Sequence, residues 1–479
     1  MEIKTVRTDD RAIAAAEVEK ALERSVKTSG VHAYVWGSDS KIRKVTAAFG
    51  TAALLFAFAA GPARAERRVG VRDAIDSAIA TNVTTKLASA ESEAARAQAL
   101  EAASSLLPGV LGTASQSRIF RQNLAAIGLT GGPIPSLIGP YNSFDARLRL
   151  TQTLFDFSTI KRYQAAGAGK ELAARQEDAA REQVAAAASL AYVEALRARK
   201  AVAAAQADDE LAKRLLAQAQ DQEKAGTVNG VDVVRAQTRE SAAGVELLQA
   251  QVAERDAAIR LSRVAGWPLG DELAFAEDLS TAALSSEPLE HALAAAQSLR
   301  PEIAAAREQA RRDALLVTAA QSERAPSLVG LADVGLSGNQ PDSGARATGS
   351  IGAALSVPLF TGGEIRGKVA AAKAQKSRSD ALLADAVAQV EEDVRLAYEH
   401  LSEAQRQVAA AEQTRNLAEQ ELKMAEDRYE AGAGDNVAVV TAQAELAQAR
   451  SAFVSSLAGE HDARINLASA LGEAREFKL

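Results

Sequence analysis

The chain of 479 residues contains a long internal repeat. Residues 148–266 return, in loose register, as residues 353–472. Tyr192 matches Tyr398, Leu261 matches Leu467 and Gly266 matches Gly472, always at the same offset (398 − 192 = 206). A repeat of this length indicates a duplicated half and not the short unit of a solenoid. The sequence therefore predicts two similar halves around an internal pseudo-symmetry.

Each half contains two segments with the alternation of β-strands. The clearest are residues 145–155 and 350–360, where apolar residues alternate with small or polar ones. Weaker partners precede them at residues 109–120 and 327–337, across loops rich in Gly, Pro and Asn. One hairpin is therefore predicted per half, at about 109–155 and 327–360.

The strand pattern fits two environments. An apolar face, a polar face and a length of about ten residues are typical of transmembrane strands. A small soluble sheet with one wet face fits the same alternation. Four strands are too few for a closed barrel, so a role in a membrane requires several copies of the chain.

Long heptad helices account for most of the rest. Val387, Val390, Val394, Ala397 and Leu401 step by three and four, and the same seam occurs 206 positions earlier. Such stepping is typical of helices packed as coiled coils. Proline is absent from residues 161–225 and 365–431, which predicts two helices of roughly 100 Å at ~1.5 Å per residue.

Glycine turns end both long helices. The turns cover residues 225–230 and 431–436, and returning helices are predicted at 231–265 and 437–471. Glycine just after a helix and Asn or Asp just before the next one are the usual stop and start signals. Further helices are predicted over residues 71–104 and 288–322.

The N-terminus resembles an export signal. Basic residues at 41–44, an apolar run at 45–60 and Ala63-Arg64-Ala65 form the three parts of a cleavable signal peptide. A short membrane anchor is the alternative, although the apolar run is below the ~20 residues that a spanning helix needs. Residues 1–40 are an extension without a predicted function, and the chain has no cysteine.

Composition and spacing argue against several functions. The net charge of −7 excludes the basic excess that nucleic-acid binders normally show. His32, His291, His400 and His461 are scattered, without a second ligand at metal spacing. No phosphate loop or nucleophile motif is present. We therefore expect no enzyme activity, no cofactor and no metal site.

One charged pair interrupts the heptad seam. Asp209 and Arg415 occupy equivalent places in the two halves. One hypothesis is that they pair between neighbouring helices, where a buried pair would set register more than stability. The alternative is that the two residues do not pair.

The order of these elements resembles the TolC family of outer-membrane efflux proteins. The resemblance covers residues 69–472 and includes the strand-to-helix joints Thr153-Leu154-Phe155-Asp156 and Val357-Pro358-Leu359-Phe360. The turns Ala225-Gly226-Thr227 and Ala431-Gly432-Ala433 also match. Each mark alone is weak, and their repetition at a fixed spacing makes the resemblance specific.

The resemblance implies a mainly α-helical homotrimer in the outer membrane. Three four-stranded contributions would close a twelve-stranded β-barrel in lipid, continuous with a periplasmic coiled-coil tunnel. The tips of the helical hairpins, residues 225–232 and 431–438, would meet a periplasmic adaptor, or membrane fusion protein. An inner-membrane pump would supply the energy, so that the chain is a passive duct for small molecules. The docking residues implied are Ala225, Gly226, Thr227, Ala431, Gly432 and Ala433.

Some family members line the closed aperture with aspartates after the second turn. The matching positions here are Ala438 and Thr441, which departs from that pattern. Asp232 and Asp435 lie close by and would form carboxylate rings that favour cations. The alternative is that both acids are helix-start residues that complement the helix dipole.

The predicted division of the chain follows the repeat. It consists of an extension (1–40), a signal peptide (41–65), the first repeat (66–267), a connector (268–287), the second repeat (288–472) and a tail (473–479). Two other functions remain open at this stage. One is an outer-membrane channel for type I protein secretion, and the other is a soluble periplasmic coiled-coil scaffold or adaptor.

Overall fold

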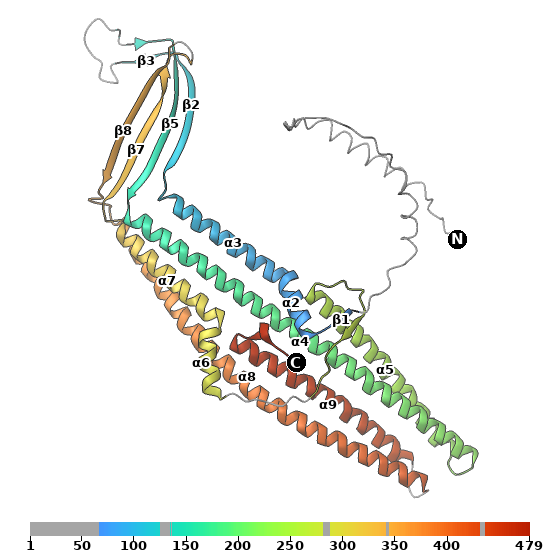
Figure 1. Cartoon of the computed structure of the whole chain (residues 1–479). Helices are drawn as coiled ribbons and strands as arrows, with labels where there is room; N and C mark the ends of the chain where they lie inside the picture. The colour runs from blue at the N-terminus through green and yellow to red at the C-terminus, as the bar shows by residue number, and fades with distance from the viewer. Residues whose placement is uncertain (1–66, 125–134, 136, 281–287, 342–343, 432–435) are drawn as a thin grey trace, which may run out of the picture. The chain divides into compact units, whose positions relative to one another are not determined.

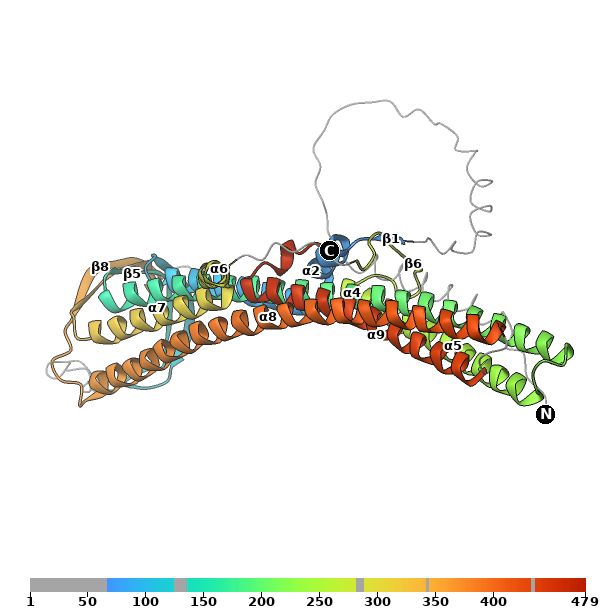
Figure 2. The same ribbon diagram turned by 90° about the horizontal axis from the view of Figure 1, so that it is seen from below.

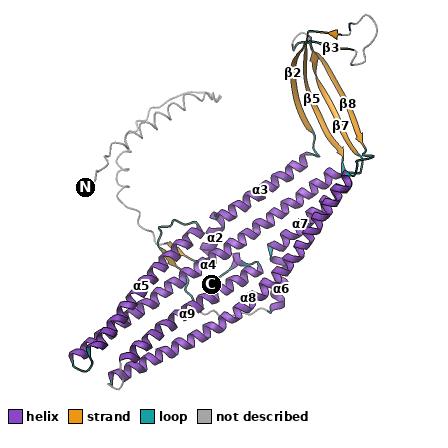
Figure 3. Ribbon diagram, turned by 180° about the vertical axis from the view of Figure 1, so that it is seen from behind, coloured by secondary structure: helices purple, strands orange, loops and turns teal. Residues whose placement is uncertain are grey.

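The computed structural model describes residues 67–124, 135, 137–280, 288–341, 344–431 and 436–479. The predicted extension and signal peptide lie outside these ranges. Within them, long helices lead to a sheet of four strands at one end (Figure 1, Figure 3).

The two halves contain the same elements in the same order. The first half consists of α2 (Val71–Thr81), α3 (Val83–Ser104), β2 (Gly109–Ile119), β5 (Tyr141–Phe155), α4 (Phe157–Lys224) and α5 (Gly230–Ala265). The second consists of α6 (Leu289–Leu299), α7 (Pro301–Ser322), β7 (Ser327–Gly338), β8 (Arg346–Ser356), α8 (Glu364–Glu430) and α9 (Asn436–Leu471). Helices α5 and α9 both have 36 residues, and α3 and α7 both have 22. The predicted duplication and the mainly α-helical class are confirmed.

Five short elements lie outside this correspondence. They are β1 (Arg67–Val69), β3 (Gln122–Asn123), β4 (Leu137–Ile138), β6 (Leu273–Phe275) and a 3-10 turn, η2 (Ala474–Glu476). Strand β1 pairs in parallel with β6, while β3 pairs with β4.

The main sheet is antiparallel and has the order β2-β5-β7-β8. Its register aligns residues of one kind across all four strands. Val110 lies opposite Leu150, Leu150 opposite Ala332, and Ala332 opposite Ile351. Because facing residues project to the same side of a sheet, the alternation predicted from the sequence becomes one apolar and one polar face.

The strand bounds differ from the prediction at three points. Strand β5 begins at Tyr141, four residues before the predicted start, and β8 both begins and ends four residues early, at Arg346 and Ser356. Pro358 explains the early end of β8, since proline has no N–H to donate to a neighbouring strand.

Two predicted helices are each divided in two. The expected helix over 71–104 ends at Thr81, and α3 restarts after Asn82, whose side chain accepts a hydrogen bond of 2.9 Å from the Thr84 N–H. The expected helix over 288–322 is divided before Pro301, which takes the first position of α7. Both breaks follow the local chemistry of helix starts, which periodicity alone does not reveal.

Helix α4 is the centre of the helical body. It packs along α5, α3 and α7, and also along α9, while α8 packs along α9 and α7 (Figure 2). The contact of α4 with α9 joins the two halves. The residues of α4 buried in the main core include a run of alanines, Ala185, Ala188, Ala195 and Ala198, which lets neighbouring helices approach closely.

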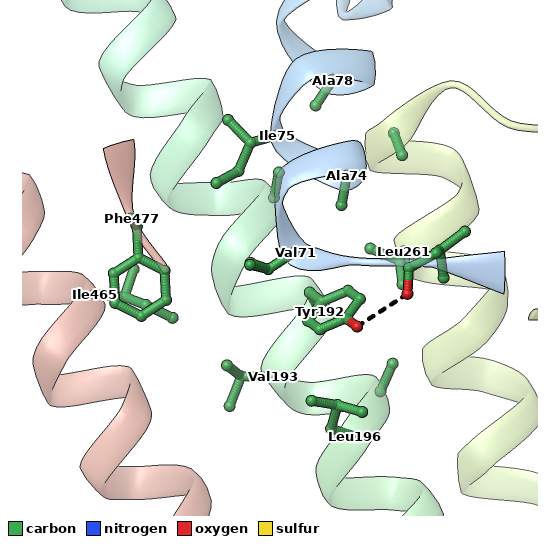
Figure 4. Close-up of a cluster of buried hydrophobic side chains, with 14 of the residues drawn as sticks. Val71, Ala74, Ile75, Ala78, Tyr192, Val193, Leu196, Leu261, Ile465 and Phe477 are labelled. Carbon is green, nitrogen blue, oxygen red and sulfur yellow. Dashed lines mark hydrogen bonds between the residues drawn. The ribbon is translucent and has the colours of Figure 1, made fainter. Parts of the chain in front are cut away.

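The main core surrounds Tyr192 of α4. Val71 and Ile75 from α2, Leu261 from α5 and Ile465 from α9 are buried around it, together with Phe477 from the tail (Figure 4). The Tyr192 hydroxyl is 3.1 Å from the Val69 carbonyl oxygen and also bonds the Glu277 carboxylate. Burial, reinforced by Glu277, raises the pKa of this phenol well above its usual range. The core thus ties β1 and the connector to α4.

Replacing Tyr192 with phenylalanine should lower the free energy of unfolding by about 1–3 kcal/mol, because the half-buried Glu277 carboxylate loses the phenol as a donor, while the Val69 carbonyl keeps the Ala276 N–H. The measurement is a thermal melt followed by circular dichroism at pH 7. Tyr163→Phe, at an exposed position of the same helix, is the matched control and should melt like the wild type. Equal melting of the two variants would contradict the role of the hydroxyl.

Candidate functional site

The tip of the first helical hairpin is a tight glycine turn. Gly226 has φ +76°, and its N–H donates to the Glu223 carbonyl at 2.9 Å. The Thr227 N–H donates to the Gln222 carbonyl at 3.0 Å, which completes a Schellman closure of α4. Asn229 then caps α5 by accepting from Val231 N–H at 3.1 Å. The predicted stop and start signals are therefore present here.

The second tip lies beside the first. Ala431, the C-cap of α8, is exposed, while the predicted tip residues Gly432, Ala433 and Asp435 lie outside the described residues. The Asn436 amide donates to the Asp232 carbonyl at 2.8 Å, and Gln218 bonds Glu430 at 3.3 Å. These two bonds connect the ends of both hairpins, so the tips form one surface.

The Asp232 carboxylate has a partner within its own helix. It is 3.2 Å from the Arg235 guanidinium, and only 16% of its side chain is exposed. Tyr429 of α8 lies near it: burial and then the Asp232 charge raise the pKa of the Tyr429 phenol. Asp232 therefore has the contacts of a helix-start acid with a compensating cation.

Ala438 and Thr441 share a hollow with the end of α8. The hollow has a volume of about 780 Å³, and the residues that line it are Glu421, Met424, Ala425, Asp427, Arg428, Ala438, Thr441 and Ala442. Met424 is 60% exposed, an unusual position for a large apolar side chain on a helix. The lining of the hollow thus combines apolar and charged residues.

The two faces of the main sheet differ sharply. Leu148, Val334, Ile351 and Leu355 of one face are all exposed. On the other face the Arg147 guanidinium is 3.1 Å from the Asp333 carboxylate and also pairs with Asp145. A continuous exposed apolar face indicates a partner surface or lipid, and a charged face indicates water.

Several cross-helix contacts were not predicted from the sequence. Arg450 of α9 is 2.5 Å from the buried Asp208 of α4, and burial, only partly offset by Arg450, raises the pKa of the Asp208 carboxyl. The predicted pairing of Asp209 with Arg415 is wrong within the chain. Asp209 pairs with Lys213 at 2.7 Å, and Arg415 lies 4.3 Å from the ring of Phe453. Asp208 directly precedes Asp209, the residue that interrupts the heptad seam in the sequence.

Two features are absent from the described residues. No helix within the described ranges is long and apolar enough to cross a membrane. In the same part of the chain, no three His, Cys, Asp or Glu side chains are grouped so that they could hold a metal ion.

Replacing Gly226 with valine should loosen the first tip, because a β-branched residue at φ +76° costs about 1–2 kcal/mol. We expect limited proteolysis within residues 225–230 to become about fivefold faster or more. Gly230→Ala is the control: an added Cβ there would lie 3.1 Å from the end of the Glu223 side chain, which can move. If valine left the cleavage rate unchanged, the glycine would not be needed for the turn.

Comparison with solved structures places this fold among outer-membrane channels. The CmeC channel of Campylobacter jejuni superposes with a TM-score of 0.73 at 20% identity, covering 84% of this chain and 86% of CmeC. VceC of Vibrio cholerae gives 0.72 at 21%, covering 84% and 96%. The open state of MtrE of Neisseria gonorrhoeae gives 0.69 at 21%, covering 84% and 89%.

Sequence comparison identifies the family itself. No curated protein matches the chain directly. The family model described as outer membrane efflux protein matches residues 74–267 and 292–473, one segment for each half. The chain therefore belongs to the outer membrane efflux protein family.

Proposed function

We propose that the protein is the passive exit duct of a tripartite efflux system, in which three copies close a ring around one pore. The family makes the chain an outer-membrane efflux channel, not an enzyme. The ring, the adaptor and the pump are the proposed parts. The observation that carries the proposal is that the main helix and strand contacts between the two halves have unfilled counterparts on the outer sides of the chain.

The helices supply the first unfilled contact. Within the chain, α4 of the first half packs on α9 of the second. The counterparts of these helices are α8 and α5, so the equivalent contact joins α8 of one copy to α5 of the next. Within the chain, α7 also packs on α4. The counterparts of these helices are α3 and α8, so α3 of the next copy would pack on α8.

Burial agrees with this pairing. Ile465 is fully buried, whereas its counterpart Ile259 is 47% exposed. Leu211 is 7% exposed and its counterpart Leu417 is 56% exposed. In both cases the residue at the contact between the halves is buried, and its equivalent on the outer side of the chain is exposed. An exposed stripe of this kind on a coiled-coil helix needs a partner helix.

The sheet supplies the second unfilled contact. Strands β2 and β8 are its edges, and the inner contact of the halves is β5 with β7. The counterpart of that contact pairs β8 of one copy with β2 of the next. Closing the edges in this way would remove unpaired backbone groups, as a membrane requires. The apolar face would meet outer-membrane lipid, and the face of Arg147 and Asp333 would line a water-filled lumen.

The two hairpin tips are the proposed docking surface for the periplasmic adaptor. They form one surface through the Asn436–Asp232 bond. Ala225, Gly226 and Thr227, with Ala431 and the neighbouring Gly432 and Ala433, would be the contacts. Ala438 and Thr441 would line the aperture beside them, with Asp232 and Asp435 close by. Opening would shift the coiled-coil ends between two packings.

Two alternatives are separated by their consequences in the cell. A channel for type I secretion would use the same ring and a different pump, and its loss would remove a protein from the medium. A soluble periplasmic scaffold would be found outside membrane fractions, a result that membership of an outer-membrane family argues against.

Engineered cysteines should capture the proposed edge contact, because the natural chain has none. Arg149 faces Asp333 across the inner contact. Aligning β5 with β8 at Phe155 and Phe360, and β2 with β7 at their first residues, gives Ala354 and Ser115 as the counterparts on the outer edges. We expect the double variant Ser115→Cys with Ala354→Cys to form disulfide-linked dimers and trimers after oxidation. The measurement is a denaturing gel without reductant on isolated outer membranes.

The control pair is Ser115→Cys with Leu355→Cys, since Leu355 projects to the other face of β8 and should not crosslink. A ladder that continues beyond trimers, or a double variant that stays monomeric, would rule out the three-copy ring.

Loss of the gene should raise retention of an efflux dye several-fold, because the pump would lack its exit from the periplasm. Dye fluorescence in deletion cells, with and without the wild-type gene, measures this effect. Unchanged retention together with the loss of a secreted protein from the medium would favour the type I alternative.

A further inference from the structure

A charged cluster lies where the two halves meet inside the chain. Arg197 of α4 holds Glu194 through two bonds of 2.6 Å. Asp462 of α9 interacts with both groups, and Arg260 of α5 adds a further positive charge near Glu194. Two carboxylates here share two guanidinium groups. The cluster is therefore compensated by cations that carry charge at every physiological pH.

The counterpart of this cluster lies between copies. The equivalent contact between copies joins α8 to α5 of the next copy. In it, each residue of the cluster is replaced by the residue 206 positions away in the other half. Glu194 becomes His400, Arg197 becomes Glu403, and Asp462 becomes Asp256 of the next copy. Arg260 becomes Asn466. His400, Glu403 and Asp256 are all exposed in the single chain, as residues that await a neighbour would be.

The exchange reverses the balance of charge. Both guanidinium groups are lost, and two carboxylates, Glu403 and the Asp256 of the next copy, are brought together. Of the mapped groups, His400 is the one that can carry a positive charge. Two facing carboxylates without a cation repel each other, and an imidazolium between them would remove that repulsion.

We propose that His400, protonated, bridges Glu403 of its own helix and Asp256 of the neighbouring copy, so that the contact between copies is strongest at mildly acidic pH. This inference rests on the ring proposed above. It assigns an ionic contact between copies and makes the cohesion of the ring dependent on pH.

Other charged groups near this level face elsewhere. Arg255 precedes Asp256, but its counterpart His461 turns to the connector, where its Nε2 lies 3.1 Å from the Ser280 carbonyl oxygen. Glu254 corresponds to Glu460, whose charged neighbour is Arg464, and Arg464 corresponds to Ala258. On α8, Glu399 is exposed and adds negative charge. Arg260 of the next copy, one turn after Asp256, lies near Glu194 of its own α4. Arg406, three residues after Glu403, corresponds to Lys200, which pairs with Asp278 at 3.0 Å. His400 is therefore the cation at the mapped contact whose charge changes near neutral pH.

The sign of the pH effect follows from the partners gained. An imidazolium that gains carboxylates stabilises the assembly below the ordinary histidine range, and the effect is lost as pH rises through it. His461 acts in the opposite direction, because burial lowers its pKa and favours the folded state at higher pH. Burial and Glu194 raise the pKa of Asp462 to about 6, so its stabilising effect at acidic pH is lost as pH rises through that value. The part of the profile between pH 6.5 and 8 that a substitution of His400 removes therefore isolates His400.

The experiment uses the full chain purified as a ring in detergent, with the dissociation temperature measured between pH 6.5 and 8. The wild-type ring should lose about 5 °C over this range. His400→Gln should lose much less over the same range. His400→Lys should keep the acidic-pH stability at pH 8, because lysine remains charged. His291→Gln, on the exposed face of α6, is the control and should behave like the wild type.

The outcomes separate this inference from the ring itself. If no ring forms at any pH, the proposed assembly fails. A wild-type ring with a flat pH profile, or one that His400→Gln leaves unchanged, overturns the role of His400 alone. A profile that a chelator abolishes would assign the contact to a bound divalent cation instead and would also overturn the protonated bridge.

Discussion

The packing of α4 against α9 is the contact on which the rest of the structure depends. It joins the two halves, and the side chains that α4 buries in the main core are largely small, with Tyr192 and Leu196 as the largest. Alanines bury little area each, so a single such contact is weak. Its stability comes from length, since the 36 residues of α9, roughly 54 Å of helix, repeat the same close approach several times.

A duplicated chain cannot satisfy all of its own surfaces. Two similar halves provide two equivalent contacts, and one pair of halves can make only one of them. Leu417 and Ile259 are exposed in the single chain, whereas their counterparts Leu211 and Ile465 are buried. The exposed apolar surface is thus a geometric result of the duplication, and the repeat itself specifies which surface meets which.

The sequence predicted the long helices and the turn that ends the first one well. It predicted helix breaks and contacts between distant helices less well. Heptad spacing and the turn glycines located the long helices and the closure at Gly226, because these signals are periodic or local in the chain. It missed the break at Asn82, where one cap overrides a continuing pattern. It also missed the pairing of Asp208 with Arg450, because no rule of spacing links residues so far apart. The residues around the second turn remain predictions.

The core around Tyr192 has a consequence for how the chain matures. It unites β1, the connector and the final residues, since Arg72 bonds the Arg475 carbonyl and Arg475 pairs with Glu182. These segments are separated by hundreds of residues, and closing such long loops is slow. The central core therefore forms only after the last residues have emerged. The central core is therefore assembled from both ends of the chain together and is not completed in the order in which the residues are made.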